Sequence, residues 1–304
     1  MKMKKYILTT VIALIAAAGN AQQLQTSSHY DLQGILHNPS IAGVQQSPSV
    51  KGMLGGSYRQ QWSGISGSPR TLNLVGSFKL EDLKAGIGGY IFSDKTGPTS
   101  RTGIDLAFAK HIPLNNDAVF SLGIDARMQQ YAVDMEKLSE SLGNDPLLAG
   151  NDNKFKFDAG FGISFTTPKF QIGAAVSQLV QSKLDFYKGD LNRSAEGRLY
   201  RHYYLHSHYK WNVDDATTIT PHVLGIYLPN APFEFTGGAR VEHRELFWWG
   251  VGYRIRQGWL LNAGIHFMKK FSVGYSYDIY NAPISEFNAG HSAHEVLLRF
   301  NFLK

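Results

Sequence analysis

The sequence contains no cysteine among its 304 residues. Disulfide bonds and thiolate metal sites are therefore excluded. Small exported domains commonly depend on disulfides. We therefore expect this fold to be held together by packing or by a closed sheet.

Charge is also scarce, because charged residues make up only 18% of the chain and the formal net charge is +6. Three lysines lie within the first five residues, and removing them lowers the charge to +3. A small, scattered excess of this kind does not predict a surface that binds nucleic acid.

Long apolar runs are missing beyond the N-terminus. At the N-terminus itself, the three lysines precede a short apolar run over residues 6–18, followed by small residues. This pattern predicts a secretory signal peptide over residues 1–21, with cleavage after Ala21. No later stretch has the eighteen apolar residues that a spanning helix requires, so an exported chain without such helices is expected.

Period-two alternation of apolar and polar residues recurs along the rest of the chain. In "KFSVGYSYDIY", the aromatic and aliphatic side chains fall on one face and the small polar ones on the other. Most of these segments are about ten residues long, which suits a tilted strand that crosses a membrane better than the strand of a typical soluble protein. Fourteen segments are found, centred on residues 50–58, 70–78, 84–93, 101–110, 118–129, 154–165, 169–178, 199–211, 216–227, 232–241, 245–255, 258–267, 270–279 and 293–302.

The apolar face is rich in large aromatics, whereas the polar face is mostly small and uncharged. A soluble sandwich would show a charged outer face, so this pattern indicates apolar side chains in lipid and polar ones in a lumen. Because every backbone group in lipid needs a partner, the strands must close. We predict a single all-β outer-membrane barrel of about fourteen antiparallel strands over residues 50–304. The charged side chains predicted to face its lumen are Asp105, Lys110, Asp125, Arg127, Glu295 and Arg299.

The connections between the predicted strands also follow a pattern. Those after the even-numbered segments are short, and those after the first, third, fifth, seventh and thirteenth are longer. This predicts short periplasmic turns, longer outer loops and both termini in the periplasm. Residues 132–143 are expected to form a short helix in an outer loop. Several aromatics near strand ends suggest interfacial girdles: Trp211, Trp248, Trp249, Trp259 and Tyr280.

Three local patterns carry a family resemblance: "NPSIAG" over 38–43, "YRQQWSGISGSPRT" over 58–71 and "HSAHEVLLRFNF" over 291–302. In this order they resemble the PorP/SprF family, outer-membrane proteins of the type IX secretion system of Bacteroidota. The resemblance implies a non-enzymatic barrel that acts with other secretion components of the periplasm or outer membrane. It would support export or surface anchoring of cargo that carries a C-terminal sorting domain, in some members for gliding motility.

The residues that the resemblance and the motifs single out are expected to dock partners. Residues 22–49 form a predicted periplasmic segment, long enough to enter the lumen as a plug or to reach a partner. The candidate interaction residues are Asn38, Pro39, Gly43, Arg59, Gln61, Trp62, Gly64, Pro69, His294 and Glu295.

Other functions fit the sequence less well. His202, His206 and His208 share one face of a strand, as metal ligands can, but a polar row facing the lumen is the simpler interpretation. No nucleophile-elbow motif or nucleotide loop stands in a suitable context, so neither an enzyme nor a cofactor is predicted. The alternatives that stay open are a passive porin or a transporter of hydrophobic substrates, and a soluble secreted all-β protein.

Overall fold

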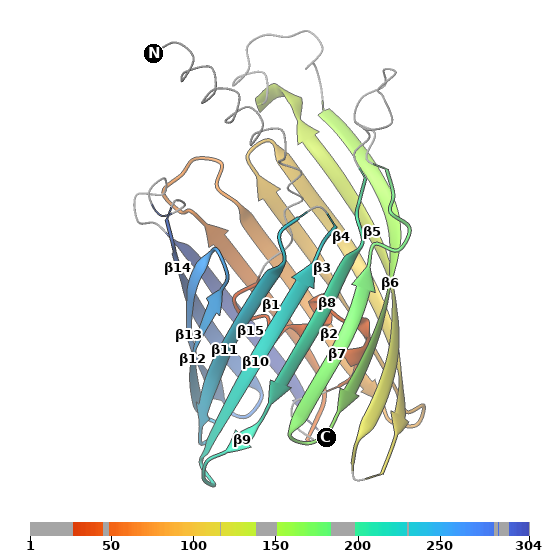
Figure 1. The fold of residues 1–304 in the computed structure, drawn as a ribbon, viewed down its shortest axis with the longest axis vertical. Helices are drawn as coiled ribbons and strands as arrows, with labels where there is room; N and C mark the ends of the chain where they lie inside the picture. The colour runs from red at the N-terminus through yellow and green to blue at the C-terminus, as the bar shows by residue number, and fades with distance from the viewer. Residues whose placement is uncertain are drawn as a thin grey trace, which may run out of the picture.

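The structure, a computed structural model, describes residues 27–44, 49–115, 117–137, 151–183, 198–229, 231–282, 285 and 292–303. Its strands form one antiparallel sheet in which the last strand pairs with the first, so the sheet closes into a barrel (Figure 1). The strands are β1 (Val50–Gln61), β2 (Arg70–Leu80), β3 (Ala85–Thr96), β4 (Thr99–Pro113), β5 (Val119–Asp134), β6 (Asn151–Thr166), β7 (Phe170–Ser177), β8 (His202–Tyr209), β9 (Trp211–Asn212), β10 (Thr217–Tyr227), β11 (Glu234–His243), β12 (Phe247–Arg254), β13 (Gly258–Phe267), β14 (Phe271–Tyr280) and β15 (Ala293–Leu303).

The predicted barrel of fourteen crossings is confirmed, because β8 and β9 lie end to end beside β10 and make one crossing. β8 pairs with β10 up to His222, and β9 resumes the pairing at Ile219. The gap falls beside Pro221, which has no backbone N–H to give to the ladder. A single proline therefore accounts for the extra strand.

The inverted arrangement of side chains is also confirmed. On β14, Phe271 and Tyr275 are exposed on the outer face, whereas Ser276 and Asp278 are buried on the inner face. One charge was assigned to the wrong face. Lys110 shares the parity of the exposed Phe108, and its Nζ donates a 2.6 Å hydrogen bond to the Leu83 carbonyl in the adjacent turn, so it lies outside the lumen at the rim.

The connections define two ends of the barrel. At the short-turn end, the connections span residues 81–84, 114–118, 167–169, 213–216, 244–246 and 268–270, and β1 begins and β15 ends there. At the opposite, loop end, the prediction of a long connection after the third strand was wrong. β3 and β4 extend until Thr96 pairs with Thr99, leaving a two-residue turn. Strands β4 to β6 are the tallest part of the wall (Figure 1).

The expected helix over residues 132–143 is largely absent from the described part of that range. Residues 132–134 continue β5, and only residues 135–137 are helical, while 138–143 lie outside the described residues. Among the described residues, none of the helices has the length and apolar character of a membrane-spanning helix. The extension of β5 reflects continued pairing with β6 from Ala132 to Asp134.

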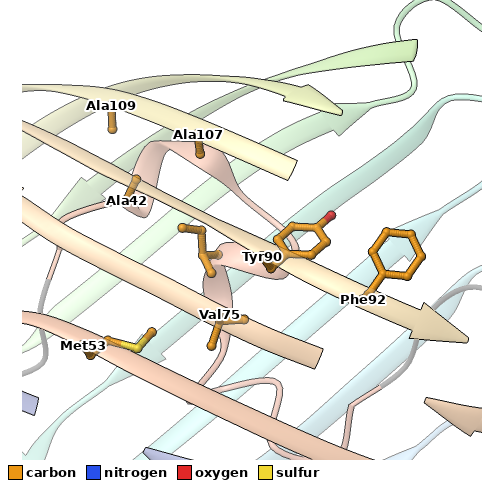
Figure 2. Packing of buried hydrophobic residues seen from close by; sticks show 8 residues of the cluster. Ala42, Met53, Val75, Tyr90, Phe92, Ala107 and Ala109 are labelled. Atoms are coloured by element: carbon orange, nitrogen blue, oxygen red, sulfur yellow. The ribbon is translucent and has the colours of Figure 1, made fainter. Parts of the chain in front are cut away.

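Residues 27–44 lie inside the barrel and carry two 3₁₀ helices, η1 (Gly34–Leu36) and η2 (Pro39–Ile41) (Figure 1). Ile35 and Ala42 of this lumen segment pack into a buried apolar cluster with inward side chains of β1 to β4 (Figure 2). The cluster includes Met53, Val75 and Tyr90. The lumen face of β1 to β4 therefore carries some apolar residues, because they pack against the apolar side chains of the lumen segment.

Two aromatics assigned to interfacial girdles point the other way. Trp248 and Tyr280 are 2% and 6% exposed and face the lumen, because they share the parity of the buried residues of β12 and β14. Trp248 meets the His29 ring of the lumen segment edge-on, with ring centroids 5.6 Å apart. By contrast, Trp249 and Trp259 are exposed on the outer face, as a girdle requires.

Candidate functional site

Two of the three sequence motifs meet the lumen segment where the barrel closes. Arg59 of β1 and Glu295 of β15 are direct register partners across the closing pair of strands. Arg59 Nη2 lies 2.6 Å from Asp278 Oδ2 of β14, and Arg59 Nη1 lies 3.5 Å from Glu295 Oε2. We call this group, with Ser27, Ser28 and Arg254, the seam cluster.

The start of the lumen segment binds both carboxylates of the seam cluster. The Ser27 hydroxyl donates to Glu295 Oε1 at 2.7 Å, and the Ser28 backbone N–H donates to Glu295 Oε2 at 2.7 Å. The Ser28 hydroxyl donates to Asp278 Oδ1 at 2.7 Å and accepts from Arg59 Nη1 at 2.5 Å. Two consecutive serines thus join β1, β14 and β15.

Further hydrogen bonds surround this centre. Arg254 of β12 donates to the Ser27 carbonyl at 3.2 Å and lies 3.8 Å from Asp278 Oδ2. The Tyr280 hydroxyl accepts from Arg59 Nη2 at 3.2 Å and donates to Gln61 Oε1 at 3.0 Å. The predicted residue Gln61 therefore contacts the cluster through Tyr280.

The charges of the seam cluster are almost completely removed from water. Arg59, Asp278 and Glu295 are each at most 1% exposed. Two guanidinium groups face two carboxylates, so the formal charges balance. Hydrogen bonds to charged groups are roughly twice as strong as neutral ones, but a buried charge that loses its partner is strongly destabilising. The cluster is therefore selective for one arrangement of its strands and of the lumen segment.

Asn38 anchors the middle of the lumen segment. Its Oδ1 accepts from the backbone N–H and hydroxyl of Ser40 at 2.9 and 2.7 Å, which caps η2. Its Nδ2 lies 2.9 Å from His206 Nε2 and donates to the Ile163 carbonyl at 3.1 Å. The residue thus caps a turn and bonds it to the wall.

Glycines on the lumen face make room for this turn. A Cβ on Gly123 would collide with the backbone of Pro39 and Ser40, and a Cβ on Gly162 would collide with the Asn38 side chain. Near the exit of the segment, Gly43 has φ +77°, a conformation that favours glycine. The turn therefore lies on glycines of the wall, which allow close approach.

Between the two anchors, the lumen segment carries titratable groups in buried contacts. Tyr30 Oη lies 2.7 Å from His222 Nδ1. Burial favours a neutral Asp31, but the hydrogen-bonded Arg240 guanidinium outweighs it and holds the pKa of Asp31 below its usual value. Burial lowers the pKa of His37 to about 3, and the nearby His206 and Arg254 add to the effect, so His37 is neutral.

A cavity of about 570 Å³ lies between the lumen segment and the short-turn end. Ile35 and Val44 of the segment line one side, and Thr167 of a short turn and Lys210, between β8 and β9, line the other. The volume lies within the range of small-ligand pockets. The lumen is thus filled around the seam cluster and Asn38 but hollow near the short turns.

The other predicted interaction residues lie around the loop end. The Trp62 backbone N–H donates to the Ser292 carbonyl at 3.1 Å, and the residue has φ 50°. Gly64 is exposed, and the buried Pro69 accepts from the Gln61 backbone N–H at 2.9 Å. His294 faces outward, with Nδ1 2.6 Å from the Tyr275 hydroxyl. Six of the ten predicted residues are buried: Asn38, Pro39, Gly43, Arg59, Pro69 and Glu295.

Several members of this site are not among the residues predicted from the sequence. Asp278 could have been found, because it is the one acidic residue on the polar face of "KFSVGYSYDIY". Ser27, Ser28 and the partnership of Asp31 with Arg240 carry no comparable pattern. His202, His206 and His208 do face the lumen as predicted. Among the described residues, no three His, Cys, Asp or Glu side chains are placed so that they could hold a metal ion together.

Comparisons with known proteins agree with this architecture. The CymD monoaromatic hydrocarbon channel superposes with a TM-score of 0.53 at 12% identity, over 90% of this chain and 93% of its own. The Ralstonia pickettii toluene transporter TbuX gives a TM-score of 0.49 at 10% identity, over 94% and 96%. Acinetobacter baumannii Omp33 gives a TM-score of 0.48 at 9% identity, over 83% of this chain and 98% of its own. At such identities the likeness to CymD shows the fold alone.

Among curated proteins, none matches this chain. A family model does match, over residues 19–300, and its description is type IX secretion system membrane protein PorP/SprF. The match includes the lumen segment, Arg59 and Glu295. Together with the closed barrel, it locates the protein in the outer membrane. The chain belongs to the PorP/SprF family of type IX secretion system membrane proteins.

Proposed function

We propose that this protein supports export or surface anchoring of cargo proteins by docking other secretion components, and that it does so without catalysing a reaction. Membership of the PorP/SprF family supports the assignment to the type IX secretion system. The cargo would carry a C-terminal sorting domain, and adhesins for gliding motility are one class of it.

The observation that carries the docking proposal is the occupied lumen. Residues 27–44 are bonded to the wall by the seam cluster near the loop end and by Asn38 in the middle, and Ile35 and Ala42 are buried against β1 to β4. A water-filled porin needs a continuous polar path through its lumen, and this segment stands across it. Recognition of a protein at the surface of the barrel needs no such path.

The accessible parts of the predicted motif mark the proposed outer contact. Trp62, half-buried, and the exposed Gly64 lie in the connection after β1, which also exposes Ile65. Aromatic anchors surrounded by small residues are favourable centres for protein contacts. The buried motif residues would then act indirectly, by fixing the rim that bears this connection.

The short-turn end is the proposed face for other secretion components. In the orientation predicted from the turn lengths, this end and its cavity face the periplasm. Periplasmic components would reach it without entering the membrane.

Export in cells tests the proposal. A strain that lacks its own copy is complemented with the wild type, Trp62→Ala or Trp259→Ala, a tryptophan exposed on the outer face of the wall. We expect Trp62→Ala to reduce cargo at the surface at least threefold at equal barrel abundance, and Trp259→Ala to leave it unchanged. Full export with Trp62→Ala would contradict the outer contact.

The second candidate function is a passive porin or a transporter of hydrophobic substrates, and the CymD-like fold and the 570 Å³ cavity favour it. Measurement of conductance distinguishes this function from a docking role. The purified wild type in planar bilayers should conduct little. Steady, voltage-independent conductance, or uptake of a monoaromatic probe into vesicles, would favour the transporter instead.

A further inference from the structure

We propose a further function for the lumen segment: Ser27 and Ser28 act as a clamp that fixes the register in which β15 pairs with β1 and closes the barrel. This role concerns how the barrel is completed. It is independent of whether the finished barrel docks partners or transports a solute.

The register of the closing pair is weakly specified by the backbones and the outward apolar side chains of the two strands. β1 contains Gly52, Gly55 and Gly56, which offer no side chain to pack, and glycine-rich strands are prone to slip. The outer face of β15 is uniformly apolar over residues 296–302, with Val296, Leu298 and the phenylalanines that follow. A shift of two residues would keep apolar side chains outside and polar ones inside.

Charged groups in the lumen remove this ambiguity. In the observed register, Arg59 faces Glu295 directly. A shift of two residues would place Arg59 opposite Leu297 or Ala293 and separate it from the Glu295 carboxylate. Because both groups lie away from water, the shifted pairing leaves two buried charges without their partner.

The serines extend this control from two strands to three. Glu295 and Asp278, from β15 and β14, accept hydrogen bonds from Ser27 and Ser28, and the same Ser28 hydroxyl accepts from Arg59 of β1. The hydrogen bonds of this one dipeptide can therefore all form only when β14 and β15 stand in the observed register relative to β1. The position of the dipeptide along the barrel axis is set independently of the seam, because Asn38 of the same segment is bonded to His206 of β8 and to the carbonyl of Ile163 in β6.

This geometry also implies that the lumen segment docks on the open sheet before β15 pairs with β1. The lumen segment lies across the interior, between the wall at β6 to β8 and the seam at β14, β15 and β1. A completed barrel would have to be entered from one end, whereas an open sheet can receive the segment from the side. The segment docked on the open sheet would then present Ser27 and Ser28 to the two edges as they meet.

Paired cysteines test the proposal in the full chain, which has none of its own. Gln60 and His294 are opposed across the seam, and Ser93 and Thr102 are opposed across β3 and β4. Directly opposed residues have Cβ atoms about 4.5–5.5 Å apart, within reach of oxidative cross-linking after slight adjustment. Gln60→Cys with His294→Cys reports the native seam, and Ser93→Cys with Thr102→Cys serves as the matched control.

Each reporter is combined with Ser27→Ala/Ser28→Ala in outer membranes of the producing cell. We expect at least a fivefold loss of the seam cross-link, a change of less than twofold in the control, and a gain in Gln60→Cys paired with Val296→Cys, which reports a two-residue shift. Ser27→Thr/Ser28→Thr, which keeps both hydroxyls, should restore most of the native cross-link.

Two results would overturn the proposal. One is an unchanged seam cross-link in the double alanine variant. The other is an equal loss in the seam and control reporters, which would mean that the serines only stabilise the barrel in general. If the double variant does not accumulate, Ser28→Ala alone and Glu295→Gln provide milder changes that are scored in the same way.

Discussion

Arg59→Met keeps much of the length of the side chain but removes the guanidinium that joins Asp278 and Glu295. Loss of one partner from a buried ion pair costs about 3–5 kcal/mol. The lower end applies here, because Ser27 and Ser28 still donate to both carboxylates and Arg254 stays 3.8 Å from Asp278. A loss of about 3 kcal/mol corresponds to roughly a 100-fold change in the unfolding equilibrium.

The assay is urea unfolding of the purified barrel in detergent, followed by tryptophan fluorescence. With a slope of about 3 kcal/mol per molar urea, the midpoint should fall by about 1 M. Lys79→Met is the matched control, since Lys79 lies 3.8 Å from Glu81 in a pair that is nearly half exposed. That pair should contribute less than about 1 kcal/mol.

A third variant separates unpaired charge from lost packing. Arg59→Met combined with Asp278→Asn and Glu295→Gln removes all three charges together, and such replacements are often close to neutral. It should recover at least half of the midpoint shift. If Arg59→Met shifts the midpoint no more than Lys79→Met does, the seam cluster does not hold the barrel together electrostatically, and the reasoning fails.

Three further outcomes are expected. Gly162→Ala should lower stability by about 2 kcal/mol through collision with Asn38, whereas Gly76→Ala, which meets the flexible end of a side chain on the outer face, should cost less than half as much in the same urea assay. Stability should fall as the pH drops from about 6.5 to about 3, by up to about 1.4 kcal/mol per pH unit, because His37 binds a proton only when unfolded; His37→Gln should flatten that slope. Trp62→Ala should lower cargo display without lowering the thermal midpoint by more than a few degrees, which circular dichroism of the purified variant measures.

The barrel itself could be predicted from the sequence because its cause is local. Alternation with a period of two assigns each side chain to lipid or lumen along a strand, and β14 follows this rule from Phe271 to Tyr280. The errors arose where pairing between strands decided the outcome. β3 and β4 continue through residues 93–96 and 99–100 because they pair, although the proline and glycine between them predict a longer loop.

The site was predicted less completely, since its members are far apart in the chain. Arg59 and Glu295 were singled out with the motifs that carry the family resemblance, and the lumen parity of Glu295 was predicted. That the two residues oppose each other follows only from closure of the sheet. The same limit applies to Trp248. It is an aromatic residue near a strand end, as girdle residues are, but its side chain is on the inward face of β12, beside His29.

The sequence alone determined the class of the fold and the faces of its strands, because both depend on periodicity within about ten residues. Tertiary structure decided what occupies the lumen and where the motifs meet. Ser27 lies 268 positions from Glu295 along the chain, and no local pattern specifies which of the polar groups facing the lumen will share a hydrogen bond. Their partnership is set by the closure of β15 on β1, which brings the two ends of the chain around one buried set of charges.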